Sequence, residues 1–320
     1  MRVIVIGGTG HIGTYLVPQL VTAGHEVVVL SRGQRAPYHT HGAWQKAEMI
    51  SVDRTAEDAA GTFGSTIAGL DPEVVIDLIC FTQESARQLG EALHGRVQQL
   101  LHCGTIWVHG ASTAVPTRED APRHPFGEYG IAKAAVERYL LDAARRQGLP
   151  ATIIHPGHIS GPGWVPVNPA GNLDLEVFQK LADGTELALP NLGLETLQHV
   201  HAIDVAGMFL AAMANRSVAV GESFHAVADG ALTLRGYAEG VAASFGRDAK
   251  LTYLPWHRWR ETVGTQDAEI TWDHIAHSPH CSMDKAARLL GFRPRYSPLE
   301  TVLDAIGWLM ANDRISTKRG

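Results

Sequence analysis

The sequence has few cysteines, few lysines and no long apolar run near its start, and each shortage excludes a class of protein. Its three cysteines, Cys80, Cys103 and Cys281, form no CxxC pair, which argues against a disulfide framework and against a thiolate metal site. The first apolar run covers only residues 3–6, whereas a signal peptide or a membrane span needs a much longer one. We therefore expect a cytoplasmic protein without a membrane partner.

Basic charge is also scarce. The chain of 320 residues carries 27 Lys and Arg against 33 Asp and Glu, which gives a formal charge of −6. Proteins that bind DNA or RNA usually carry clustered Lys and Arg on a basic face, so no nucleic acid is expected as a partner. The HExxH and GxSxG motifs are absent, which leaves zincin and serine-hydrolase chemistry without support.

Short β-branched runs alternate with helical stretches along the first half of the chain. Strands are predicted at 3–6, 27–30, 49–52, 74–79, 100–103 and 151–154, and helices at 11–23, 83–94 and 129–147. This rhythm predicts an α/β fold with a Rossmann-type, doubly wound parallel sheet. From about residue 156 the chain is rich in Pro, Gly and Asn. We therefore expect a dinucleotide-binding domain at 1–160, rejoined by 195–227, and a smaller C-terminal substrate-binding lobe at 161–320.

A glycine-rich loop spaced GxxGxxG follows the first predicted strand directly. In a dinucleotide-binding domain its glycines permit a tight turn, close approach of the backbone to a pyrophosphate, and close packing of the next helix. The anion then lies on free amide groups at the positive end of that helix. The residues expected to bind the cofactor here are Gly7, Thr9, Gly10, His11, Ile12 and Gly13.

The end of the second predicted strand bears on the choice between NAD and NADP. It holds Ser31-Arg32 where a carboxylate would bond the ribose 2′-hydroxyl of NAD. Arg32, helped by Arg35, can instead pair with a 2′-phosphate, so the sequence leans to NADP. A solvated Arg32, or one stacked on adenine, leaves NAD open. Asp53 and Arg54 follow the third strand at the same edge and are expected beside the adenine.

Tyr129 and Lys133 stand four residues apart at the start of the clearest predicted helix, so both side chains lie on one face. A phenol titrates at about 10 in water, and a fixed ammonium group beside it lowers that pKa. Tyr129 is therefore a candidate general acid/base for a carbonyl or carbinol oxygen. Lys133, one of only six lysines, is expected to lower the pKa of Tyr129 and to bond a ribose hydroxyl of the cofactor.

With these motifs the chain resembles the extended short-chain dehydrogenase/reductase superfamily, in particular its NAD-dependent epimerase/dehydratase branch. The resemblance also covers segments 101–110, 155–163, 199–206 and 285–294. It implies a catalytic hydroxyl at Thr105, five residues before Gly110. The further contacts that it implies are Ile79, Cys80, Lys133, Pro156 and His158 for the cofactor, and Phe81, Trp107, Asn172 and His199 for the substrate.

The resemblance implies a homodimer that moves a hydride at a C–OH/C=O centre of a sugar or nucleotide-sugar, with 4-epimerisation as the outcome. Ile106-Trp107 replace the Asp-Glu pair of the dehydratases, which disfavours dehydration. Cys80-Phe81 replace a small Ala-Ala pair, so Phe81 narrows the space beside the nicotinamide. An NADPH-dependent ketone or aldehyde reductase acting on a smaller substrate is the alternative. A non-catalytic nicotinamide-sensing protein is a third hypothesis, which an intact Tyr129, Lys133 and Thr105 disfavours.

Three further features of the sequence are tested below. His155 stands where the family has Arg, which is expected to alter the pocket. Among 17 histidines the densest cluster is His274, His277 and His280 with Cys281, but Pro279 leaves their directions open and we expect no metal. The cations of the second half that are candidates for holding a substrate diphosphate are Arg235, Arg258 and Arg260.

Overall fold

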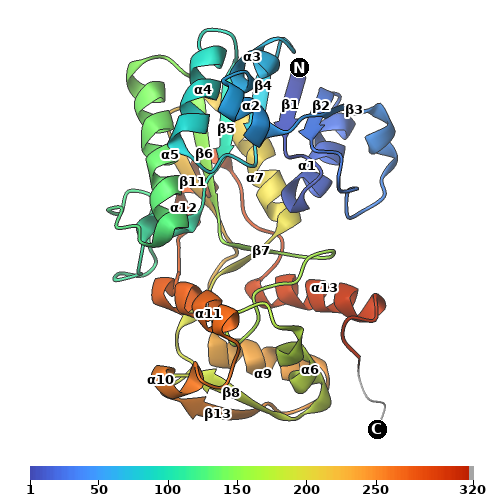
Figure 1. Cartoon of the computed structure of the whole chain (residues 1–320), viewed down its shortest axis with the longest axis vertical. Helices are drawn as coiled ribbons and strands as arrows, with labels where there is room; N and C mark the ends of the chain where they lie inside the picture. Colours follow the sequence, from blue (N-terminus) through green and yellow to red (C-terminus); the bar gives the residue numbers. More distant parts are fainter. Residues whose placement is uncertain (317–320) are drawn as a thin grey trace.

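The computed structural model describes residues 1–316, which form a large lobe and a small lobe (Figure 1). The large lobe is built on a seven-stranded sheet in the order β11-β6-β5-β4-β1-β2-β3. Its strands, all parallel, are β1 (Arg2–Ile6), β2 (Glu26–Ser31), β3 (Glu48–Ser51), β4 (Val74–Asp77), β5 (Gln99–Cys103), β6 (Ala151–Pro156) and β11 (Ser223–Ala226). The Rossmann-type α/β fold predicted from the sequence is confirmed.

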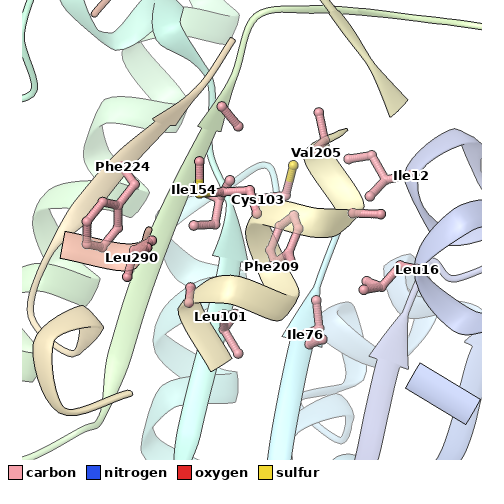
Figure 2. Close-up of a cluster of buried hydrophobic side chains, with 14 of the residues drawn as sticks. Ile12, Leu16, Ile76, Leu101, Cys103, Ile154, Val205, Phe209, Phe224 and Leu290 are labelled. Atoms are coloured by element: carbon pink, nitrogen blue, oxygen red, sulfur yellow. The ribbon is translucent and has the colours of Figure 1, made fainter. Parts of the chain in front are cut away.

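Helices cover both faces of this sheet because successive residues of its inner strands are apolar and point to opposite sides. Val3 and Val5 of β1 belong to the core beneath α1 (His11–Thr22) and α7 (Ala202–Ala214). Figure 2 shows this core, in which Phe209 of α7 lies among side chains from several strands. Burying a side chain of that size contributes about 1.5–3 kcal/mol to folding.

The opposite face carries a second core. It is covered by α3 (Phe63–Ala68), α4 (Gln83–Leu93) and α5 (Gly127–Arg146), with the short α2 (Arg54–Ala60) at the end of β3. Ile4 and Ile6 point to this side. α5 begins two residues before the predicted start, so Tyr129 lies in its first turn.

Segment 195–227 returns the chain from the small lobe to the sheet. It contains β9 (Thr196–Leu197), β10 (His199–His201), α7, α8 (Arg216–Ala219) and β11. β11 pairs in parallel with β6, which places Phe224 beside Ile154. α12 (Asp284–Leu290) then packs against β11, so the large lobe also takes residues from near the end of the chain.

The small lobe has a core of its own, formed by residues such as Phe178, Tyr237 and Trp259. Its strands are β7 (His158–Ser160), paired with β10; β8 (Glu186–Pro190), paired with β13 (Lys250–Leu254); and β12 (Leu232–Thr233), paired with β9. Its helices are α6 (Leu175–Asp183), α9 (Leu234–Ser244), α10 (Trp256–Trp259), α11 (Thr265–His277) and α13 (Pro298–Ala311). None of the described helices combines the length and apolar character that a membrane crossing requires.

Candidate active site

The glycine loop joins β1 to α1 as the spacing predicts. Gly7 has φ +81°, and a Cβ on it would lie 2.6 Å from Cγ2 of Ile79. A Cβ on Gly13 would collide with the backbone of Gly8, so α1 can pack this closely only with glycine there. No side chain caps the start of α1 at Gly10. The free amide groups and the bare backbone fit the pyrophosphate of a dinucleotide.

A cavity of about 380 Å³, called here the edge cavity, opens beside this loop at the ends of β1, β2 and β3. Its lining includes Thr9, Arg32, Arg35, Asp53 and Arg54. Arg32 and Arg35 are exposed and form no ion pair within residues 1–316. Asp53 caps α2, since its Oδ1 accepts from the amides of Thr55 and Ala56 at 3.0 and 3.2 Å.

Arg54 differs from the other two arginines of the edge cavity because it is already paired. It is 7% exposed, and its Nη1 donates to Oδ1 of Asp77 at 2.6 Å. The same carboxylate oxygen accepts from the amide of Ile79 at 3.2 Å, and β4 ends at Asp77 instead of at residue 79. Arg54 therefore fixes the end of β4 at the floor of the cavity.

A second cavity, of about 520 Å³ and called here the main cavity, shares Gly7, Gly10, Arg35, Ile79 and Phe81 with the edge cavity. The two therefore form one elongated space across the carboxyl ends of the strands, where ligands of open α/β sheets bind. The predicted residues that line the main cavity are Gly7, Gly10, His11, Ile12, Ile79, Phe81, Thr105, Trp107, Tyr129, Lys133, Pro156 and His158.

Tyr129, Thr105 and Lys133 meet in the main cavity from two elements. Thr105 follows β5, and its Oγ1 accepts from the amide of Trp107 at 3.3 Å as the chain enters the 3-10 turn Ile106–His109. Lys133 lies one turn after Tyr129 on α5 and is 2% exposed. Its Nζ donates to the carbonyl oxygens of Cys80 at 2.7 Å and Cys103 at 2.6 Å. Cys80 thus contributes its backbone, while its side chain is buried.

The pKa of Tyr129 differs from the sequence-based expectation. Burial, with the nearby Cys103 thiol, raises the pKa of Tyr129 to about 12, and a hydrogen bond with the Thr105 side chain works in the opposite direction. The expected lowering by Lys133 is not found, because this ammonium group is directed to the carbonyl oxygens of Cys80 and Cys103. Burial also lowers the pKa of Lys133, with Cys103, Cys80 and Asp77 opposing it. Tyr129 is therefore a protonated phenol at neutral pH, which suits a proton donor.

A buried row of polar groups stands behind Thr105. The amide of Thr105 donates to Nδ1 of His155 at 3.0 Å, so Nε2 of that ring carries the proton that bonds Oε1 of Glu137 at 3.0 Å. Arg123 donates two hydrogen bonds to the same carboxylate group, from Nη2 at 2.7 Å and from Nε at 3.0 Å. Burial works to raise the pKa of Glu137, but His155 and Arg123 hold it well below its usual range. The row ties the end of β5 to β6 and α5.

Glu137 and Arg123 were not predicted as site residues. Glu137 lies four residues after Lys133 and eight after Tyr129, which puts all three on one face of α5. That spacing was the available signal in the sequence. The departure at His155 is explained by the same contacts, since a neutral imidazole there accepts from one partner and donates to the other.

The far end of the main cavity is largely aromatic. Trp107 stacks on His277 with ring centroids 4.2 Å apart, and it meets Tyr129 edge-on at 5.8 Å. His277 stacks in turn on Phe126. Phe81, at the end shared with the edge cavity, is 52% exposed, and Nζ of Lys133 lies 5.0 Å from its ring centre. The lining residues that the sequence did not identify as substrate contacts include Trp164, Val165, Val167, Leu173 and His274.

Two predicted substrate residues do not line this cavity. Asn172 is fully buried, and its Nδ2 donates to Oγ1 of Thr271 at 3.2 Å, which ties the loop before α6 to α11. His199 is also fully buried, behind His158, and its Nδ1 bonds Oγ of Ser160 at 2.9 Å. Both side chains hold the small lobe together beneath the cavity.

The histidine cluster is divided by the fold. His274 lines the main cavity, whereas His277 stacks between Trp107 and Phe126. A different group of three potential ligands, Asp77, Cys80 and His102, is buried at the ends of β4 and β5. Arg54 is bonded to Asp77, and Lys133 lies close enough to His102 to lower its pKa, although burial is the main cause of that lowering. Two fixed positive charges disfavour a divalent cation in this place.

Comparison with known proteins agrees with this geometry. Residues 3–226 match the NAD dependent epimerase/dehydratase family. The 2'-dehydrokanamycin reductase of Streptomyces kanamyceticus is 28% identical over 286 residues, covering 86% of this chain and 76% of that protein. The UDP-glucose 4-epimerase of Azospirillum brasilense is 32% identical over 186 residues, about half of each chain (53% and 51%).

Among solved structures, the UDP-glucose 4-epimerase of Thermotoga maritima has a TM-score of 0.74 at 21% identity, covering 98% of this chain and 99% of that one. At this level of identity the likeness is one of fold. The family match covers well over half of the sequence, including the glycine loop and both Tyr129 and Lys133. The chain is therefore an enzyme that belongs to the NAD dependent epimerase/dehydratase family.

Proposed function

We propose that this enzyme moves a hydride between a nicotinamide dinucleotide and a C–OH/C=O centre of a small substrate. The observation that carries the proposal is the convergence of Tyr129, Thr105 and Lys133 on a cavity whose other end is the glycine loop. The nicotinamide supplies or accepts the hydride when it is bound. Tyr129 exchanges the proton of the reacting oxygen, and Thr105 orients that oxygen by a hydrogen bond. Lys133 bonds the cofactor ribose and holds positive charge beside the site.

Two outcomes of this chemistry are kept as candidates. The first is 4-epimerisation of a sugar or nucleotide-sugar by oxidation, rotation and re-reduction, which the likeness to UDP-glucose 4-epimerases supports. The second is net reduction of a ketone or aldehyde, which the longer match to 2'-dehydrokanamycin reductase supports. Ile106-Trp107 after Thr105 disfavour dehydration. Cofactor consumption separates the two, since an epimerase regenerates its cofactor and a reductase oxidises one NADPH for each carbonyl reduced.

We propose NADP as the preferred cofactor. Arg32 and Arg35 line the edge cavity, are exposed, and make no ion pair in the described part of the chain, so both are available to a 2′-phosphate. Asp53 also lines the edge cavity, but Oδ1 of its carboxylate already accepts the two hydrogen bonds that cap α2. Measured affinities for NADP and NAD test this preference.

We also propose a homodimer in the cytoplasm. α4 and α5 pack side by side on one face of the sheet, where the family resemblance predicts the contact between subunits. The three cysteines are free and buried, which suits a reducing compartment. Light scattering of the purified protein measures the oligomeric state, and a monomer at micromolar concentration would contradict the dimer.

A further inference from the structure

The charges around the main cavity restrict its substrate. Among the described residues that line it, the only arginine and lysine are Arg35 and Lys133. Lys133 already donates to two carbonyl oxygens, and Arg35 belongs to the end shared with the edge cavity. Burial lowers the pKa of His11, His158 and His274, the three histidines of the lining, so none of these rings adds positive charge. The substrate end therefore has no cation for a diphosphate.

The cations expected to hold a diphosphate lie elsewhere in the small lobe. Arg258 is part of α10, which Figure 1 places with β8 and β13 at the end of the small lobe away from the sheet. Arg260 follows this helix directly, and Arg235 pairs with Glu239 on α9 at 2.7 Å. None of the three lines the main cavity. The sequence-based suggestion for these arginines is therefore not supported by their positions.

The main cavity is lined by apolar and neutral polar side chains where a diphosphate site would carry positive charge. Three large apolar side chains of the cavity lining are more than a third exposed: Phe81, Trp164 and Leu173. Such a cluster marks a binding surface. His158 is buried in the lining, and neither of its ring nitrogens bonds a side chain among the described residues. A buried polar atom left unpaired is unfavourable, so a hydroxyl or carbonyl group of a ligand is its natural partner.

We propose that the substrate is an uncharged, phosphate-free carbonyl compound, or the corresponding alcohol, whose apolar part packs against Trp107. The inference rests on the proposed hydride transfer and selects a substrate class for the same site. Reduction transfers one hydride to the carbonyl carbon, and its oxygen takes one proton from Tyr129, which leaves an alcohol and oxidised cofactor. Tyr129 then regains its proton from solvent. A nucleotide diphosphate would have to bury two negative charges in this cavity without a counter-ion.

The test uses the full chain loaded with NADPH and two sets of probes. Acetophenone and cyclohexanone represent phosphate-free ketones, and their reduction is measured as the loss of NADPH absorbance. UDP and UDP-glucose represent nucleotide diphosphates; their binding is measured by calorimetry, and epimerisation is measured by an assay for UDP-galactose. We expect ketone reduction and no measurable binding of UDP. Trp107→Ala should raise the KM for acetophenone about tenfold, the size of a lost aromatic contact, with a smaller change in kcat.

Two controls keep the outcomes separate. Trp107→Phe keeps an aromatic face and should restore most of the lost affinity, whereas Trp272→Ala removes an exposed tryptophan of α11 outside the cavity and should change nothing. Micromolar binding of UDP, epimerisation of UDP-glucose, or no reduction of any phosphate-free ketone by the NADPH-loaded protein would overturn the substrate class and leave hydride transfer standing. Failure to bind either dinucleotide would instead refute the proposed function.

Discussion

The two ends of the elongated cavity are built in different ways. At the cofactor end the surface is mostly backbone: a glycine loop, the uncapped start of α1 and the carboxyl ends of parallel strands, with Arg32 and Arg35 at the rim. At the substrate end it is side chains, including Trp107, His158 and His274. The first surface suits a ligand that is the same across a family. The shape and polarity of the second surface change when its side chains are substituted, which allows one scaffold to accept different substrates.

Tyr129 lines the main cavity beside Trp107 and is the proposed proton donor, so its replacement should have the largest effect. Tyr129→Phe keeps the ring and removes the phenolic hydroxyl group that donates the proton. We expect turnover to fall by about 10²–10⁴-fold with cofactor affinity unchanged. Single-turnover kinetics and a cofactor titration measure the two quantities. The matched control is Tyr139→Phe on the same helix, outside both cavities. Undiminished turnover in Tyr129→Phe would revive the non-catalytic alternative.

The polar row behind Thr105 should act on turnover and not on cofactor binding. His155→Ala removes both the acceptor of the Thr105 amide and the partner of Glu137, so we expect kcat to fall about 10–100-fold through misplacement of Thr105. The KM for NADPH should stay within about twofold, because His155 does not line either cavity.

A conservative variant separates positioning from general damage in this row. His155→Gln keeps a donor and an acceptor and should recover part of the rate, and thermal melting checks that each variant is folded. His94→Ala, an exposed histidine after α4, is the control. Equal losses in kcat and in NADPH affinity would show that the row supports the whole fold and not Thr105 in particular.

Arg32 tests the cofactor end alone. Arg32→Ala should lower the NADP:NAD affinity ratio about tenfold, the order expected for one solvent-exposed, charge-assisted bond to a phosphate. The affinity for NAD should change little. Calorimetry with both dinucleotides gives the ratio, and Arg96→Ala, a surface arginine after α4, serves as the control. An unchanged ratio would contradict the assignment of Arg32 to the 2′-phosphate.

The smallest expected effect is that of pH on the reductive direction. The pKa of Tyr129 is raised to about 12, so the phenol keeps its proton through neutral and mildly alkaline pH. We expect kcat/KM for reduction to stay flat from about pH 6 to about pH 9. In the oxidative direction, which needs the phenolate, kcat/KM should rise about tenfold per pH unit over this range. A reductive rate that falls with an apparent pKa of about 7 would assign proton donation to another group.

Much of the large lobe could be predicted from the sequence because its signals are local. The inner strands β1, β2, β4 and β6 contain β-branched runs, and the turn after β1 requires glycine at particular positions, as Gly7 and Gly13 illustrate. The pairing of Tyr129 with Lys133 follows from the helical repeat alone. The orientation of the Lys133 side chain could not be predicted: its ammonium group bonds the carbonyl oxygens of Cys80 and Cys103. For the same reason the sign of the pKa shift of Tyr129 was not predicted, and this pKa is raised instead of lowered.

The sequence by itself therefore determined the fold class, the glycine loop and the pair formed by Tyr129 and Lys133, since each depends on residues close together in the chain. Tertiary structure alone decided the substrate end. Trp107, His158 and His274 come from three distant segments, and nothing local in the sequence indicates that they share a wall. It also decided that Asn172 and His199 serve packing, because burial fixed their hydrogen bonds away from the cavity. Long-range packing determines which side chains a cavity presents, and local patterns do not encode it.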